Sequence, residues 1–283
     1  MIYFNIANQF NASAPTMALD EHKFTFRKST LSFIRGGSGD HVLLLFHGFG
    51  QDCHIFEELI EQKGHLYTVY SFDLFFHGKS EWNYGEQPVE PDFWAALLGQ
   101  FLKEYGITRF SVGGFSIGAR LALATSVAFA TRIDRLILIA PDGIGSDFIY
   151  TLSTRPLPVR WLFRYSVTHP GMFIKLSDLL QESGILSRRL TRFAAQQMST
   201  PENRSKVYFT WVVFRHISFA PGKLATILNH NSIAVSIILG KSDPVISGNR
   251  LRRFVQRLNN PDLIEIRAGH TTLVAEAIRS QLI

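Results

Sequence analysis

Short, continuous apolar runs separated by segments with helical spacing constrain the fold of this chain most. The runs are residues 42–46, 66–72, 110–113, 135–140, 234–239 and 263–266. Runs without polar alternation are typical of strands buried on both faces of a sheet. Helical patterns cover residues 55–62, 92–105, 121–130, 251–258 and 273–282, with Asp92 placed as an N-cap. Strands that alternate with helices predict βαβ units and a mostly parallel sheet.

The segment before the first buried run has a different pattern. Residues 25–34 alternate between apolar and polar side chains, and Gly36 to Asp40 form a glycine-rich stretch. The stretch lacks the lysine and hydroxyl pattern of a phosphate-binding loop, so it is predicted to be a hairpin turn. The chain is therefore expected to begin its sheet with antiparallel edge strands.

One region interrupts the alternation of strands and helices. Residues 145–220 contain no buried run, are rich in Phe, Trp, Leu and Arg, and carry several prolines. They are predicted to be a helical insertion, which divides the chain into a core of residues 1–144 and 221–283 and an insertion of residues 145–220. The aromatic stretches 161–163 and 208–214 are expected to pack the insertion and roof an apolar pocket.

The net charge of +6 belongs to this insertion. Residues 145–220 hold ten Lys and Arg against four Asp and Glu, whereas the remainder of the chain is neutral. Arg188, Arg189 and Arg192 are interpreted as a solvated helix face, and attraction to an anionic substrate or a membrane surface stays open. No nucleic-acid-binding module is recognisable, so nucleic acid is not expected as a partner.

Several classes of protein are disfavoured. One cysteine, Cys53, allows neither an intramolecular disulfide nor a cysteine-based zinc site. His54, Glu57 and Glu58 lack the spacing of a helical zinc motif, so no metal site is expected. The sequence shows no signal peptide and no apolar stretch long enough to span a membrane, which predicts a cytoplasmic location.

The pattern G-x-S-x-G at residues 114–118 is the strongest indication of chemistry. It lies between the apolar run 110–113 and the helical run that begins at Ala119. A serine on a tight strand-to-helix turn needs small neighbours, here Gly114 and Gly118, because the flanking segments come close together. Such a turn exposes the hydroxyl and directs the next helix N-terminus at developing negative charge. Ser116 is therefore a candidate nucleophile.

Other polar residues follow the neighbouring runs. His47, Gly48 and Phe49 follow residues 42–46, and Asp142, Asp243 and His270 follow the last three runs. Because ligands of parallel sheets bind beyond the carboxyl ends of the strands, these side chains are expected at one edge. Histidine can take the serine proton and return it, and a carboxylate can orient the imidazole. The N–H groups of Phe49 and Ile117 are candidate donors to the oxyanion.

These motifs, in this order, resemble the α/β-hydrolase family over almost the whole chain. The resemblance implies a mainly parallel eight-stranded sheet flanked by helices, with a cap inserted after strand six. It implies a triad of Ser116, Asp243 and His270, while Asp142 stays an alternative acid because some relatives carry the acid after strand six. His47 is expected to orient the oxyanion loop.

The expected activity is that of a serine hydrolase, in first place a carboxylic-ester hydrolase of the class EC 3.1.1. Its substrate is expected to be a small ester with a hydrophobic part, and no metal or organic cofactor is required. Carbon–carbon bond hydrolases, thioesterases and acyltransferases with the same triad remain alternatives. A non-catalytic binding protein with this fold is a further alternative, because fold does not fix function.

Overall fold

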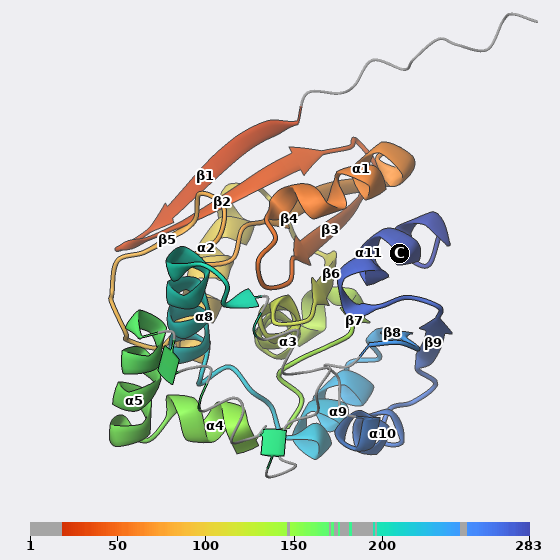
Figure 1. Ribbon diagram of the computed structural model, residues 1–283. Coiled ribbons are helices and arrows are strands. Elements are labelled where there is room, and N and C mark those ends of the chain that lie inside the picture. The colour runs from red at the N-terminus through yellow and green to blue at the C-terminus, as the bar shows by residue number, and fades with distance from the viewer. Residues whose placement is uncertain are drawn as a thin grey trace, which may run out of the picture.

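The computed structural model describes residues 19–145, 148–169, 171–172, 175, 181–182, 195, 197–243 and 248–283. Their strands form one nine-stranded sheet in the order β1-β2-β4-β3-β6-β7-β8-β9, and a short β5 pairs with β2 (Figure 1). The strands are β1 Asp20–Phe26, β2 Ser29–Gly36, β3 His41–Phe46, β4 Tyr67–Phe72, β5 Glu81–Trp82, β6 Phe110–Phe115, β7 Ile133–Ile139, β8 Ala234–Gly240 and β9 Asp262–Ile266. The sequence predicts eight strands, and the additional ninth strand is the two-residue β5.

Most of the sheet is parallel. The pairs β3 with β4, β3 with β6, β6 with β7, β7 with β8 and β8 with β9 are all parallel. Only the edge that contains β1 and β2 is antiparallel, where β2 also meets β4 and β5. The predicted mostly parallel sheet with antiparallel edge strands is thus confirmed.

The predicted hairpin turn at Gly36 to Asp40 was wrong. The hairpin turns at Arg27 and Lys28, between β1 and β2, although neither residue is a usual turn former. Gly36 to Asp40 instead connect β2 to β3, and β4 lies between these two strands. The glycines serve a close approach: a Cβ on Gly37, which has φ +80°, would lie 2.1 Å from the carbonyl oxygen of Tyr67.

Helices cover both faces of the sheet, and successive side chains of each buried strand point to opposite faces. On β3, Leu44 and Phe46 face one core and Leu43 and Leu45 face the other, as the period of two requires. The first layer contains α2 Pro91–Glu104, α3 Gly118–Ala128, α9 Pro221–His230 and α10 Gly248–Val255, and the second contains α1 Glu57–Lys63 and α11 Leu273–Arg279. Runs buried on both faces carry no polar alternation for this reason.

The start of α2 differs from the prediction by two residues. Glu90 is the N-cap and has an extended backbone, Pro91 is the first helical residue, and Asp92 lies within the first turn. Proline suits the first position because its missing N–H would have no helical partner there. The acidic side chain of Asp92 still interacts favourably with the helix N-terminus.

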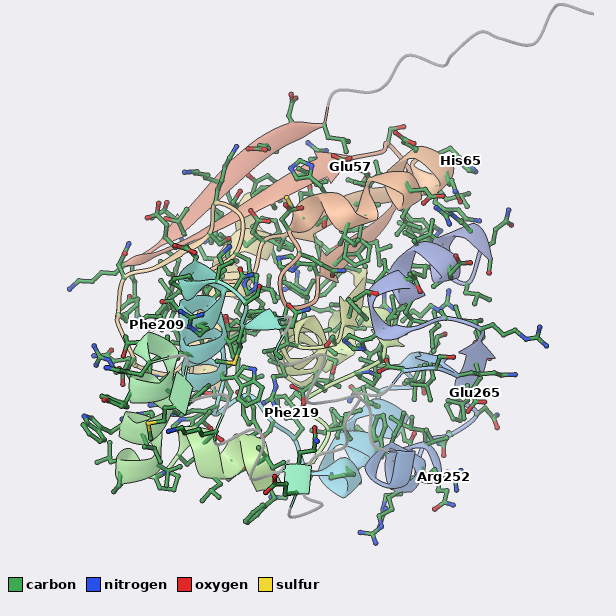
Figure 2. All side chains as sticks on the ribbon, viewed as in Figure 1. Glu57, His65, Phe209, Phe219, Arg252 and Glu265 are labelled. Carbon is green, nitrogen blue, oxygen red and sulfur yellow. The ribbon has the colours of Figure 1, made fainter. Side chains whose placement is uncertain are left out.

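The segment between β7 and β8 is helical where it is described. Its helices α4 Phe148–Thr154, α5 Leu157–Thr168 and α8 Pro201–Val213 lie together at one side of the sheet (Figure 1). The chain leaves the core at Ile144 and returns at Phe219, and these residues form an isolated parallel bridge (Phe219 is labelled in Figure 2). The division into a core and a cap of residues 145–220 stays a prediction that this bridge supports.

The aromatic side chains of this segment do not all pack inward. Phe163 contacts Tyr208 and Trp211 of α8, as expected of a packed insertion. Trp161, in contrast, is 67% exposed. Arg188, Arg189 and Arg192 lie outside the described residues. None of the helices in the described ranges is both long and apolar enough to cross a bilayer.

Candidate active site

Ser116 occupies the sharp turn between β6 and α3. Its φ is +51°, in the left-handed region that serine rarely adopts. The backbone hydrogen bonds between β6 and β7 continue up to Ser116, whose N–H donates to the carbonyl of Ile139 over 2.9 Å. The carbonyl oxygen of Ser116 then accepts from the N–H of Asp142 over 3.1 Å. The strained turn is therefore fixed by the last residue of β7 and by the loop that follows β7.

Two glycines let the strand and the helix come this close. A Cβ on Gly114 would lie 2.6 Å from the Cα of Ala119, and a Cβ on Gly118 would lie 2.3 Å from the carbonyl oxygen of His47. Both contacts are with backbone, so no side chain could move aside. The two small residues of the G-x-S-x-G pattern are thus required by the packing of α3 against β3 and β6.

His270 and Asp243 complete a chain of hydrogen bonds to the serine. Nε2 of His270 lies 3.0 Å from Oγ of Ser116, and Nδ1 of His270 lies 2.6 Å from Oδ2 of Asp243. An ionised carboxylate only accepts, so Nδ1 carries the proton and Nε2 offers its lone pair to the hydroxyl. All three side chains are more than nine-tenths buried, which protects the hydrogen bonds from water.

The loops that carry the acid and the histidine are tied to one another. The N–H of Ser242 donates to the carbonyl of Ala268 over 3.2 Å. The N–H of Asp243 donates to the carbonyl of Gly240 over 3.1 Å. A Cβ on Gly240 would lie 2.6 Å from the same carbonyl oxygen of Ala268. The Phe115 ring packs against the imidazole of His270, with the centroids 5.0 Å apart. These contacts set the distance between carboxylate and imidazole.

The loop after β3 lies beside the serine turn, since β3 and β6 are neighbours with Phe46 opposite Gly114. Gln51 closes the loop by accepting from the N–H of Gly48 over 3.0 Å. Within the described part of the chain, neither the Phe49 nor the Ile117 amide has an acceptor. Unoccupied amides on two adjacent loops are what an oxyanion site requires.

His47 is held as a neutral imidazole. Burial lowers the pKa of His47 to about 4, against a weaker opposing effect of its hydrogen bond to Gly48. Nε2 accepts from the N–H of Leu74 over 3.0 Å, which leaves the proton on Nδ1, 2.6 Å from the carbonyl oxygen of Gly48. With hydrogen bonds at both nitrogens, His47 links the loop after β3 to the loop after β4, and its role in orienting an oxyanion loop stays a prediction.

The loop after β4 is organised around Asp73. Its carboxylate accepts from the N–H groups of Cys53 and Lys79, both over 2.8 Å, and its side chain is buried. His77 donates from Nδ1 to the carbonyl of Phe75 over 3.2 Å. Burial and the neighbouring His47 lower the pKa of His77 to about 3. These groups shape the loop. Burial, together with the nearby Asp73 carboxylate, also raises the pKa of the Cys53 thiol, which disfavours Cys53 as a thiolate nucleophile.

Asp142 meets an arginine instead of the histidine. Its two carboxylate oxygens lie 2.7 and 3.1 Å from Nε and Nη2 of Arg120. Arg120 is 1% exposed, donates to the carbonyl of Ile217 over 2.8 Å, and lies 4.0 Å from the ring centroid of Tyr150. Arg120 was not singled out in the sequence. Its position in the apolar run 119–124 could have indicated a buried cation that needs an acidic partner.

Aromatic side chains join the loop after β4 to the helical segment. Phe76, with φ +69°, stacks on Phe209 of α8 at 5.4 Å, and His77 meets the Phe49 ring edge-on at 5.1 Å (Phe209 is labelled in Figure 2). Two ring contacts thus involve neighbouring residues of the loop after β4, one toward the loop after β3 and one toward α8. The described residues contain no group of three or more His, Cys, Asp or Glu that could hold a metal ion.

Comparisons with known proteins agree with this architecture. The human protein 1-acylglycerol-3-phosphate O-acyltransferase ABHD5 is 29% identical over 140 residues, which are 47% of this chain and 38% of the relative. The chain thus spans less than half the length of such curated relatives. A bacterial membrane phospholipase A has a TM-score of 0.64 at 21% identity, covering 94% of this chain and 86% of that one.

A thermophilic esterase from Thermogutta terrifontis has a TM-score of 0.65 at 17% identity, covering 93% of this chain and 98% of that one. At such identities the likeness to solved structures is one of fold. The sequence model of the alpha/beta hydrolase fold matches residues 41–277, which include every strand from β3 to β9. The chain therefore belongs to the alpha/beta hydrolase family.

Proposed function

We propose that the protein is a serine hydrolase that cleaves carboxylic esters with a hydrophobic part. The observation that carries the proposal is the continuous chain of hydrogen bonds from Asp243 through His270 to Ser116, at 2.6 and 3.0 Å. A serine hydroxyl is a weak nucleophile on its own, and this chain supplies the base that it needs.

The reaction follows from the proton positions. Oγ of Ser116 attacks the ester carbonyl carbon while its proton passes to Nε2 of His270, and Asp243 stabilises the imidazolium. The carbonyl oxygen becomes an oxyanion that accepts from the amides of Phe49 and Ile117. His270 then protonates the leaving alkoxide, which gives an acyl-enzyme and an alcohol. Water, deprotonated by His270, releases the acid and restores Ser116.

The preference for a hydrophobic part rests on the rings beside the site. Phe49 belongs to the oxyanion loop, and His77, Phe76 and Phe209 extend an aromatic environment from that loop to α8. Apolar surface next to a reactive carbonyl favours acyl or aryl groups, which lose contact with water on binding.

A fluorophosphonate tests the proposal directly, because an activated serine displaces its fluoride and forms a stable phosphonate ester, whereas ordinary serines react very slowly. Intact mass should show a single adduct on the wild type and none on Ser116→Ala. Ser242→Ala is the matched control, since this serine is exposed and one residue from the proposed acid, and it should keep the adduct. A folded wild type that stays unlabelled would favour the non-catalytic binding protein.

Acyl transfer is a second candidate, and the likeness to a relative named as an acyltransferase favours it. The two reactions share the acyl-enzyme and differ only in whether water or an alcohol accepts the acyl group. Product analysis with an aryl ester, with and without a lysophospholipid acceptor, separates them. Coenzyme A thioesters and vinylogous diketones in the same panel test the thioesterase and the carbon–carbon bond hydrolase.

A further inference from the structure

Exposed apolar side chains gather on two adjacent helices. Seven large apolar residues are exposed among the described residues, and five of them lie on α4 and α5. These five define the α4–α5 face: Phe148, Leu152, Leu157, Trp161 and Tyr165. Single exposed apolar residues are common on proteins, whereas their concentration on two helices that pack together is typical of an interaction site.

On α5 these residues form one stripe. Leu157, Trp161 and Tyr165 recur every four residues, so they share one side of the helix. The Trp161 ring stacks on Tyr165 at 5.9 Å, and Tyr165 stacks on His169 at 3.8 Å. The inward side of the same helix is also apolar, since Val167 is buried with Tyr208 and Val212 of α8. Packing among the residues that the structure describes therefore does not account for the outward stripe.

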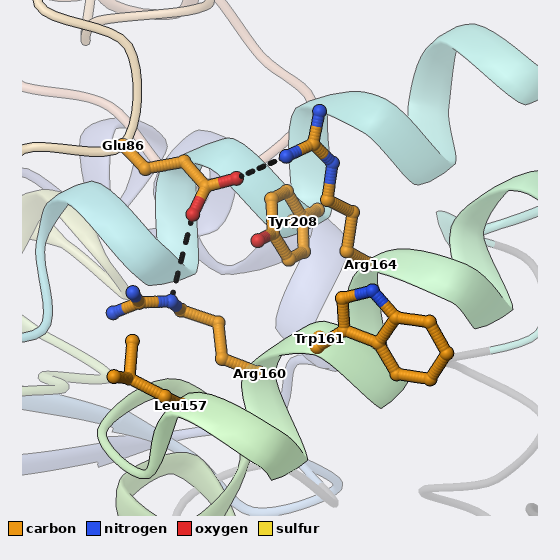
Figure 3. A pocket seen from close by; sticks show the side chains of 6 residues that line it. All are labelled: Glu86, Leu157, Arg160, Trp161, Arg164 and Tyr208. Atoms are coloured by element: carbon orange, nitrogen blue, oxygen red, sulfur yellow. Dashed lines mark hydrogen bonds and ion pairs between the residues drawn. The ribbon is translucent and has the colours of Figure 1, made fainter.

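The helices below this face are firmly attached. Glu86 lies 3.5 Å from Arg160 and 3.0 Å from Arg164, around a pocket of about 290 Å³ between α5, α8 and the loop of Glu86. Figure 3 shows both guanidinium groups reaching toward Glu86, while the indole of Trp161 lies away from it. The hydroxyl of Tyr150 holds α4 by donating to the carbonyl of Trp211 over 2.8 Å. Leu157 and Trp161 are thus exposed at 69% and 67% on well-anchored helices.

Positive charge exceeds negative charge on this surface, even though the carboxylate of Glu86 lies between Arg160 and Arg164. Residues 148–169 contain three arginines and no acidic residue. Arg155 is exposed, and the side chain of Arg164 is 64% exposed even though it contacts Glu86. Aromatic and aliphatic side chains flanked by arginine are typical of helices that lie in a bilayer interface, where the rings enter the headgroup region and cations meet phosphates.

We propose that the α4–α5 face docks on the surface of an anionic phospholipid bilayer. The five apolar side chains enter the boundary between headgroups and acyl chains, and Arg155 and Arg164 contact lipid phosphates. A second copy of the chain fits this face less well, because a two-fold contact would bring together two surfaces that both carry more arginine than acid.

Vesicle sedimentation tests the docking without depending on the proposed hydrolase activity, since the chain used is Ser116→Ala. It should pellet with vesicles of phosphatidylcholine and phosphatidylglycerol and much less with phosphatidylcholine alone. Adding Leu157→Ser and Trp161→Ser should lower the partition coefficient at least about tenfold, because two large apolar groups no longer leave water. Arg155→Gln with Arg164→Gln should lower it about tenfold on anionic vesicles only.

The matched control changes exposed leucines elsewhere. Leu66 and Leu263 are 45% and 47% exposed, and Leu66→Ser with Leu263→Ser should leave vesicle binding unchanged. Equal urea midpoints would show that all variants fold. The proposal is overturned if the parent chain binds no vesicles, or if the control pair lowers binding as much as the α4–α5 pair. It is also overturned if the α4–α5 pair abolishes self-association, measured by sedimentation equilibrium, and leaves vesicle binding unchanged.

Discussion

Asp142 and Asp243 both follow a parallel strand, but their carboxylates have different partners. Asp142 binds the buried guanidinium of Arg120 through two oxygens, and Asp243 lies 2.6 Å from Nδ1 of His270. The sequence left both residues open as the acid of a triad. The hydrogen bond between Ser242 and Ala268 joins the loop of Asp243 to the loop of His270, and a linear pattern does not show that contact.

Asp243→Asn is expected to lower kcat on an aryl ester by about 10⁴-fold, the loss typical when an amide replaces the acid of a triad. The amide can donate to Nδ1 and so stabilise the tautomer that has its proton on Nε2. That tautomer cannot accept the proton of Ser116. Steady-state kinetics of the purified variant measure the effect.

Asp142→Asn is the control for this prediction. It should keep kcat within about tenfold of the wild type, and it should lower the free energy of unfolding by about 2 kcal/mol, because the Arg120 cation loses its charged partner. Urea unfolding gives the second quantity. The opposite result, a severe loss of kcat in Asp142→Asn and a small one in Asp243→Asn, would transfer the proposed acid role to Asp142.

At the scale of elements, the first turn of α3 lies directly on the end of β3. Gly118 is the contact point, since its Cβ position is 2.3 and 2.4 Å from the carbonyl oxygens of His47 and Phe46. Ser116 lies in the turn just before this helix, and Arg120 lies in the first turn of the helix. Any displacement of α3 therefore changes the position of the serine and of the Ile117 amide together.

Gly118→Ala is expected to lower the free energy of unfolding by about 3 kcal/mol, because the added methyl group meets backbone that cannot rotate away. The rate of fluorophosphonate labelling should fall as well, because the oxyanion site and the nucleophile move. Urea unfolding and time-resolved intact mass measure the two effects.

Gly99→Ala, within α2, is the matched control. A Cβ there lies 3.6 Å from the Phe129 ring, an ordinary contact, so the variant should gain about 0.5–1 kcal/mol from helix propensity and keep its labelling rate. If Gly118→Ala matched this control in both measurements, the tight contact between α3 and β3 would not be needed for folding or for the site.

Features that depend on local sequence were predictable, and features that depend on packing were not. The glycines of the serine turn and the runs buried on both faces are visible in the sequence. The hairpin turn at Arg27 and Lys28 was missed because the alternation of residues 25–34 continues through it. The outward position of Trp161 was missed because α5 has apolar residues on both sides, which removes the periodic signal.

At the scale of the whole molecule, two neutral imidazoles make stability depend on pH. His47 and His77 have pKa values lowered to about 4 and about 3, and their rings are 5.3 Å apart. In the unfolded chain both titrate near pH 6.5. Between about pH 6.5 and 4 the unfolded state therefore binds more protons, so stability falls as the pH is lowered through this window and is fully present above it.

Lowering the pH from 8 to 5 is expected to reduce the free energy of unfolding by about 4 kcal/mol through these two residues, about half from each. That is a large part of the 5–15 kcal/mol typical of a domain. Urea titrations at both pH values measure the change, and His77→Phe is the informative variant because a ring remains at the junction of Phe49 and His47 without a titrating group. The variant should lose about half of the pH dependence. If it kept the full dependence, groups other than these buried histidines would control the acid stability of the fold.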